Sequence, residues 1–141
     1  MKHLSFILAG SIIVLSVEGS TIKSFSDLVR GGHNAATIFQ KTVKVPRFVV
    51  FKCTMKDCAP CKKIAPEFDA LASKYSTVAD FIELDVHLFD DVIRPYDIKT
   101  APSFIIFHKG RLVSSLRGSK MIGEIAKILD AELKKEEAAA A

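Results

Sequence analysis

The 141-residue chain contains no tryptophan, and ten phenylalanines supply most of its aromatic mass. It has no glycine-rich phosphate loop and no serine nucleophile elbow, so no motif points to nucleotide binding or serine hydrolysis. No segment clusters lysine and arginine with interleaved aromatic residues, so the net charge of +4 gives little reason to expect nucleic-acid binding. A second Cys-x-x-Cys and a close histidine pair are also missing, which leaves zinc without two of its usual ligands. His33, His87 and His108 stand alone, and we expect them at the surface.

The composition is otherwise that of one globular domain, with 49% hydrophobic and 26% charged residues. At the N-terminus, Lys2 and His3 precede an apolar run over residues 4–17, the pattern of a secretory signal peptide, and this run is short for a membrane span. We expect cleavage between Gly19 and Ser20; an uncleaved membrane anchor is the alternative. The mature chain, with no stable membrane span, would be secreted or act in the endoplasmic reticulum lumen, where disulfides persist.

Strand-like and helix-like segments alternate along the mature chain. Residues 20–42 are expected to supply an N-terminal strand and helix, residues 43–133 the core of the domain, and residues 134–141 a flexible tail. The hydrophobic patterns predict strands at residues 20–25, 48–53, 81–86, 103–108 and 111–116, and helices at residues 26–30, 35–42, 61–75, 88–96 and 120–133. Pro66 should kink the helix that contains it. This order predicts an α/β sandwich around a mixed sheet.

A Cys-x-x-Cys pair, Cys58 and Cys61, lies between the expected central strand and the helix after it. The first N–H groups of a helix lack partners within the helix, and the helix dipole is positive at that end, so a sulfur placed there ionises more readily. We expect Cys58 to attack a disulfide and Cys61 to resolve the mixed disulfide that forms. The third cysteine, Cys53, falls on the central strand and should be a buried, inert thiol. An intermolecular or regulatory disulfide is the alternative for Cys53.

Further motifs accompany the cysteine pair in a fixed order: Pro66 five residues after it, an apolar run over residues 81–86, Ala101-Pro102-Ser103-Phe104, and Phe107-His108-Lys109-Gly110. Together they make residues 43–133 resemble a thioredoxin domain. The resemblance implies a three-layer sandwich with a central mixed sheet, a Cys58–Cys61 disulfide, and thiol–disulfide oxidoreductase activity without a cofactor or bound metal. It also implies that Pro102 follows a cis peptide bond and orients the substrate backbone beside the cysteines. A proline that only starts a strand is the alternative for Pro102.

The chain departs from the family at two places. Asp57 stands directly before Cys58, where the family usually has tryptophan, and a neighbouring carboxylate disfavours the thiolate. Lys52 stands where the family carries a buried aspartate, and Glu83 where it often places a lysine. We therefore expect Lys52 and Glu83 to pair beneath the active site, because a lone buried lysine would be costly. A buried Glu83 could accept the proton of Cys61; the alternative is that Lys52 reaches water and has no chemical role.

These features predict a thiol–disulfide oxidoreductase of the secretory pathway that acts on protein disulfides and exchanges electrons with a reductase or an oxidase. The missing tryptophan and the altered buried pair leave a second function open, a redox-inactive binding or chaperone module that uses the groove beside Pro102. A Cys58→Ser variant that still binds client chains would favour this second function.

Overall fold

The computed structural model describes residues 2–8, 11–17 and 22–141. The expected cleavage site between Gly19 and Ser20 lies outside these residues. The first two strands, β1 (Lys2–Leu8) and β2 (Ser11–Val17), pair with each other in an antiparallel two-stranded sheet separate from the main one. Within the described residues, no helix combines the length and apolar character needed to cross a bilayer.

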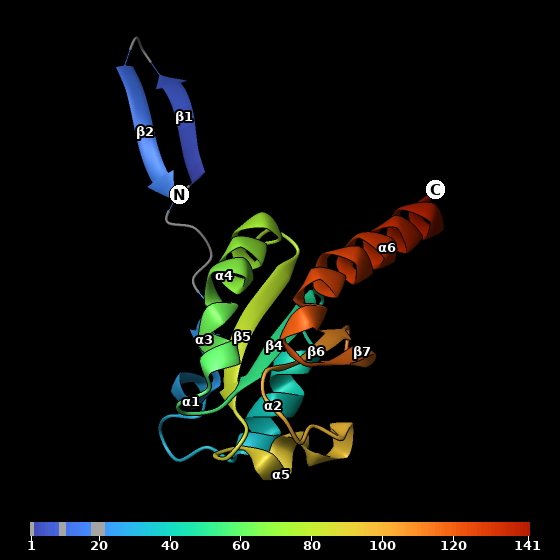
Figure 1. The fold of residues 1–141 in the computed structure, drawn as a ribbon. Coiled ribbons are helices and arrows are strands. Elements are labelled where there is room, and N and C mark those ends of the chain that lie inside the picture. Colours follow the sequence, from blue (N-terminus) through green and yellow to red (C-terminus); the bar gives the residue numbers. More distant parts are fainter. Residues whose placement is uncertain (1, 9–10, 18–21) are drawn as a thin grey trace.

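The main sheet has five strands in the order β3-β5-β4-β6-β7 (Figure 1). The strands β3 (Lys23–Ser24), β5 (Ala79–Asp85) and β4 (Phe48–Thr54) run parallel to one another. The strand β6 (Ser103–His108) pairs antiparallel with β4, and β7 (Arg111–Arg117) pairs antiparallel with β6. The central strand β4 is buried along nearly its whole length, as its nearly continuous apolar sequence predicts. The expected mixed sheet is therefore confirmed.

Helices cover both faces of this sheet. One face packs against α1 (Phe25–Leu28), α2 (Ala35–Val43) and α5 (Asp90–Ile93), which is followed by a 3₁₀ turn over Arg94–Tyr96. The other face packs against α4 (Ala65–Lys74) and α6 (Ile122–Ala140), which follows a 3₁₀ turn over Ser119–Met121. Alternate residues of β4 enter the two cores, Phe51 one and Val50 the other, as the two-residue period of a strand requires. The result is the three-layer α/β sandwich that the sequence predicts.

The helix expected over residues 61–75 is two helices. The helix α3 spans Ala59–Lys63 and α4 begins at Ala65, with Ile64 between them as the C-cap of the first and the N-cap of the second. Pro66 lies in the first turn of α4, where its missing N–H costs no intrahelical hydrogen bond, so it starts a helix instead of kinking one. The expected first strand is also shorter: among the described residues it comprises only Lys23 and Ser24, because Phe25 already begins α1.

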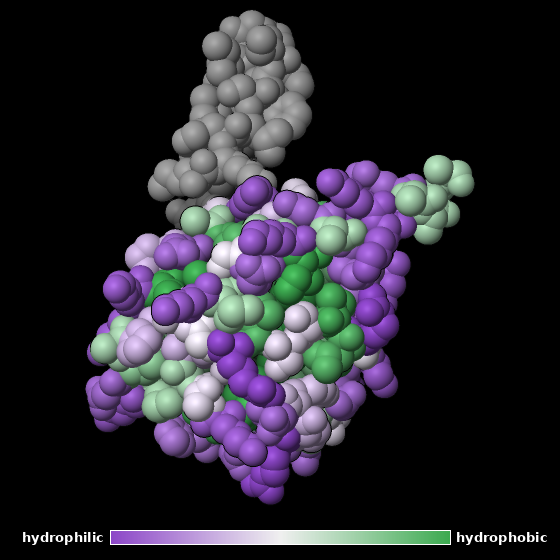
Figure 2. Space-filling view, turned by 45° about the vertical axis from the view of Figure 1, so that its right-hand side comes forward, coloured by the Kyte–Doolittle hydropathy of each residue, from purple (hydrophilic) through white to green (hydrophobic). Residues whose placement is uncertain are grey.

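The C-terminal segment differs from the expected frayed tail, because α6 continues as a helix to Ala140. Glutamate, lysine and alanine are strong helix formers. Two ion pairs also tie this helix to the β6–β7 hairpin: Lys109 Nζ lies 3.1 Å from Glu136, and an Arg111 nitrogen lies 3.0 Å from Glu132. In Figure 2 the last turns of α6 project from the domain, purple (hydrophilic) near the domain and pale green at the alanine-rich end.

His33 and His87 are exposed as expected, but the expectation is wrong for His108, which is only 7% exposed. His108 lies directly opposite Phe48 in the β4–β6 register, and the two rings stack with centroids 4.0 Å apart. Its Nε2 atom is 3.0 Å from a carboxylate oxygen of Glu136 on α6. The imidazole is therefore covered by the helix that extends beyond its expected end.

Candidate active site

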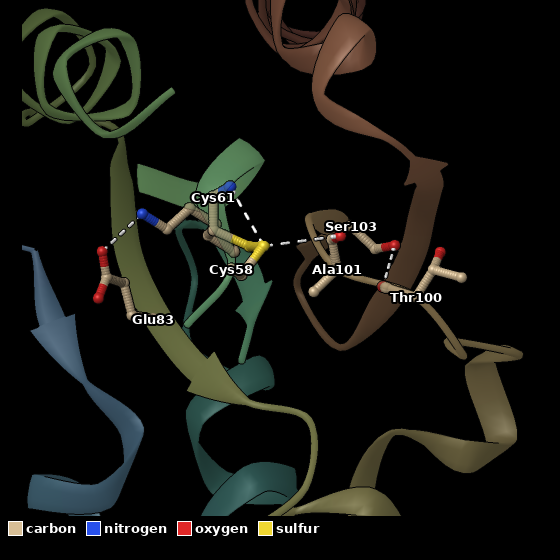
Figure 3. The surroundings of a disulfide bond; sticks show 7 residues. Cys58, Cys61, Glu83, Thr100, Ala101 and Ser103 are labelled. Carbon is tan, nitrogen blue, oxygen red and sulfur yellow. Dashed lines mark hydrogen bonds and ion pairs between the residues drawn. A yellow bond between two sulfur atoms is a disulfide. The ribbon is translucent and has the colours of Figure 1, made fainter. Parts of the chain in front are cut away.

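The turn from β4 into α3 places the two cysteines side by side. Cys58 is the N-cap of α3, and the backbone N–H of Cys61 donates a hydrogen bond to Cys58 Sγ at 3.2 Å. The two sulfurs form a disulfide, with Cα atoms 5.3 Å apart (Figure 3). Cys58 is 8% exposed and Cys61 only 3%, so Cys58 is the sulfur nearer to solvent. A backbone donor aimed at Cys58 Sγ stabilises the thiolate form of that residue.

A second loop approaches Cys58 from the start of β6. The Ala101–Pro102 peptide bond is cis, the isomer that the resemblance implies. The carbonyl oxygen of Ala101 lies 3.8 Å from Cys58 Sγ, on the side of the disulfide away from Glu83 (Figure 3). The loop is fixed by two hydrogen bonds: Ser103 Oγ donates to Thr100 O at 2.7 Å, and Gly118 N donates to Pro102 O at 2.9 Å. It therefore presents a rigid backbone edge beside the reactive sulfur.

Lys52 and Glu83 form the ion pair that the charge swap predicts. They lie opposite each other on the parallel strands β4 and β5, with Lys52 Nζ 2.7 Å from Glu83 Oε1. The Lys52 side chain is only 4% exposed, which contradicts the alternative of an ammonium group in water. Lys52 Nζ also lies 5.1 Å from the ring centroid of Phe68. This cation–π contact was missed at the sequence level, although Phe68 has the helical spacing of an inward residue.

The expected burial of Glu83 is wrong, because its side chain is 41% exposed. Glu83 pairs on its other side with Ser24, the last residue of the two-residue strand β3. So short a strand covers little of the sheet edge, and the carboxylate remains in contact with water. The prediction of a proton acceptor at Glu83 assumes a desolvated carboxylate, whereas the structure shows a partly solvated one.

The Lys52–Glu83 ion pair and the two cysteines line one cavity of about 360 Å³. Lys52 and Glu83 belong to its wall together with Cys58 and Cys61. The remaining lining residues are Thr54, Met55, Lys56, Asp57, Lys62 and Ala65. The structure thus brings together four of the five predicted site residues in one cavity, and it places Pro102 next to Ala101 on the other side of the disulfide.

Cys53 takes no part in this cavity. It is fully buried on β4 and forms no disulfide. Burial raises the pKa of its thiol from 9.0 to about 12, so little thiolate is present at neutral pH. These are the properties of the inert thiol that the sequence predicts.

Comparisons with known proteins give a consistent result. A family model described as Thioredoxin matches residues 32–131. The thioredoxin of Ovis aries is 40% identical over 73 residues, covering 52% of this chain and 69% of that protein. The thioredoxin of Staphylococcus aureus strain Mu50 is 34% identical over 76 residues, covering 54% of this chain and 73% of that protein.

Solved structures extend this likeness to the whole fold. The thioredoxin of Trypanosoma brucei brucei superposes with a TM-score of 0.70 at 18% identity, covering 86% of this chain and 99% of that chain. Thioredoxin NaTrxh of Nicotiana alata gives a TM-score of 0.65 at 26% identity, covering 82% of this chain and 96% of that chain.

Proposed function

The chain belongs to the thioredoxin family and is a thiol–disulfide oxidoreductase, and we propose that it exchanges disulfides of proteins in the secretory pathway or outside the cell. The observation that carries the chemistry is the Cys58–Cys61 disulfide at the start of α3, with the Cys61 N–H directed at Cys58 Sγ. Cys58, the more exposed sulfur, is the nucleophile, and the deeper Cys61 is the resolving residue.

In the reducing direction, the Cys58 thiolate attacks one sulfur of a substrate disulfide. The other substrate sulfur leaves and takes a proton, and a Cys58–substrate disulfide remains. Cys61, as a thiolate, then attacks Cys58 Sγ and releases the second substrate sulfur, which is also protonated. The substrate has gained two electrons and two protons, and the enzyme pair has become a disulfide. The reverse sequence oxidises a substrate dithiol.

The loop at Pro102 supplies the contact for the substrate chain in this proposal. The Ala101 carbonyl lies beside Cys58 Sγ, and hydrogen bonds from Ser103 and Gly118 hold the loop. A backbone edge held in this way could align an extended substrate segment with the reactive sulfur. The prediction that Glu83 accepts the proton of Cys61 stays a prediction: both residues line the same cavity, but the Glu83 side chain is 41% exposed and lacks the burial on which that prediction is based.

The proposed location is supported by the sequence of residues 1–19, which has the basic start and apolar stretch of a secretory signal. The partners proposed are protein substrates with disulfides or dithiols and a reductase or oxidase that resets the pair. Secretion by cells that express the full chain, followed by N-terminal sequencing, tests the location. A mature protein that begins at Ser20 is expected, and retention of the protein in the cytosol would contradict the proposal.

Insulin reduction with dithiothreitol as electron source tests the activity. The Cys58→Ser variant should be inactive, and the Cys61→Ser variant should accumulate a mixed disulfide with the substrate, because its resolving sulfur is missing. The matched control is Cys53→Ala, which removes the one cysteine outside the pair and should leave the activity in place. Unchanged insulin reduction by Cys58→Ser would overturn the proposed mechanism.

A further inference from the structure

A buried positive charge lies in the cavity beneath the disulfide. The ammonium group of Lys52 contacts the Glu83 carboxylate and the face of Phe68. Its side chain is 4% exposed, whereas that of Glu83 is 41% exposed. The two members of this ion pair thus differ in their access to water. The lysine depends on partners inside the protein, and the glutamate does not.

The other charged groups that line this cavity are Lys56 and Asp57 on the loop after β4, and Lys62 on α3. All three are exposed, so water and salt screen their effect on the sulfurs. Of the charged residues in the cavity wall, Lys52 is therefore the one whose field acts with little screening. No further charged group of β5 lines the cavity within the described residues.

Reduction changes the charge in this cavity. The disulfide is neutral, but the dithiol form must carry a thiolate on one sulfur to react with a substrate. Cys58 is 8% and Cys61 3% exposed, so water can contribute little to the stability of a thiolate on either sulfur. An anion formed there needs a counter-ion from the protein.

We propose that Lys52 is the counter-ion of the thiolate that reduction leaves in this cavity, and that it makes the Cys58–Cys61 disulfide a stronger oxidant. The inference rests on the proposed function, because it concerns the direction in which the same pair works. Lys52 exchanges one partner for another: Glu83 in the disulfide form and the thiolate in the reduced form. Glu83 can release the ammonium group at small cost because its carboxylate is already in contact with water.

The sign of the effect follows from this exchange. A group that stabilises the reduced, ionised pair more than the disulfide shifts the equilibrium toward reduction of the protein. The substrate is then oxidised: its dithiol becomes a disulfide as the protein disulfide becomes a dithiol. Lys52 thus favours the formation of disulfides in client proteins over their reduction.

A glutathione titration of the purified protein tests the inference. In this reaction one protein disulfide and two glutathiones give one protein dithiol and one glutathione disulfide. Lys52→Met keeps the length and burial of the side chain without its charge, and it should lower the equilibrium constant about tenfold, equivalent to about 30 mV. The ultraviolet absorbance of the thiolate should also appear at higher pH. The matched control is Lys63→Met, which removes an exposed charge from α3 outside the cavity and should change the constant little.

Glu83→Gln gives a second test that leaves the buried charge in place. It removes the competitor for Lys52, so the equilibrium constant for reduction should rise and resolution of a mixed disulfide should become faster. If Glu83 instead accepts the proton of Cys61, the same variant should resolve the mixed disulfide more slowly. Slower resolution of the mixed disulfide by Glu83→Gln would therefore contradict the counter-ion role of Lys52. This test holds even if Lys52→Met fails to fold.

The outcomes separate this inference from the function on which it rests. A wild-type protein that never cycles with glutathione would overturn the proposed function itself. A wild-type protein that cycles, together with a folded Lys52→Met variant of the same equilibrium constant, would overturn the inference alone. Circular dichroism and urea denaturation of the oxidised proteins establish which variants are folded.

Discussion

Cys53 should be the least reactive thiol of the chain once the disulfide is reduced. Burial raises the pKa of this thiol to about 12, against an ordinary value of 9.0. At about pH 8 an ordinary thiol is roughly one-tenth ionised, whereas a thiol of this pKa is ionised to about one part in ten thousand. Alkylation requires the thiolate, so ionisation alone should slow the modification of Cys53 about a thousandfold.

The assay is alkylation of the reduced protein with iodoacetamide at about pH 8, followed by mass spectrometry of its peptides. Cys58 should be modified quickly and Cys53 should remain free. In concentrated urea all three cysteines should react, which shows that the reagent is competent. Modification of Cys53 at the rate of Cys58 in the folded protein would refute the reasoning and would favour the alternative of a regulatory thiol.

The same pKa has a consequence for stability. The pKa of Cys53 is higher in the folded than in the unfolded protein. Ionisation of Cys53 therefore does not change the stability below about pH 9, where the thiol is protonated in both states. As the pH rises toward 12, the unfolded chain ionises first and stability is lost. A difference of about three units between the folded and unfolded pKa values corresponds to a loss of roughly 4 kcal/mol of folding stability. The free energy of unfolding of the oxidised wild type, measured by urea denaturation, should therefore fall more steeply with pH above about pH 9 than that of Cys53→Ala. The same pH dependence for both proteins would contradict the raised pKa.

Three further predictions concern the face covered by α6. Leu129→Ala removes a fully buried side chain and should cost about 2–5 kcal/mol in urea denaturation, whereas Leu112→Ala, at a 42% exposed position, should cost less than about 0.5 kcal/mol. His108→Ala removes the ring stacked on Phe48 and should lower stability by about 2 kcal/mol, with exposed His87→Ala as the neutral control; equal effects of the two variants would refute the packing role of His108. The hydrogen bond from Lys135, together with that from Arg111, lowers the pKa of Glu132 below its usual 4.5. Its contribution to stability is therefore complete above about pH 4.5 and lost as the pH falls through the lower folded value, so Glu132→Gln should be less stable than wild type at neutral pH but equal to it in strong acid.

Much of the fold follows from local patterns in the sequence. The nearly continuous apolar run over residues 48–53, interrupted only by Lys52, can be buried on both faces only at the centre of a sheet, and it forms the central strand β4. Lys109 and Gly110 both adopt positive φ angles, as a two-residue hairpin turn requires, and β6 and β7 pair antiparallel across this turn. The break at Ile64 was not predictable in the same way, because the apolar spacing continues from α3 into α4 and masks the change of helix.

The candidate site was predictable where it depends on residue types close together in sequence, and less so where it depends on the surroundings. Cys58 and Cys61 are recognisable from their spacing. The pairing of Lys52 with Glu83, far apart in sequence, follows from the resemblance to the family together with the cost of a lone buried lysine. The exposure of Glu83 depends on the length of β3, which no pattern near Glu83 encodes. The burial of His108 likewise depends on Phe48 across the sheet and on the length of α6.

The most direct test of the redox function is a titration of the protein across glutathione buffers of increasing oxidation, with quenching by an alkylating reagent and counting of the added groups by mass spectrometry. A functional pair should gain or lose two groups together, at Cys58 and Cys61, with one midpoint and with Cys53 unmodified throughout. A pair that kept the same number of groups across the whole range would show that these sulfurs do not exchange electrons, and the proposed oxidoreductase mechanism would be wrong.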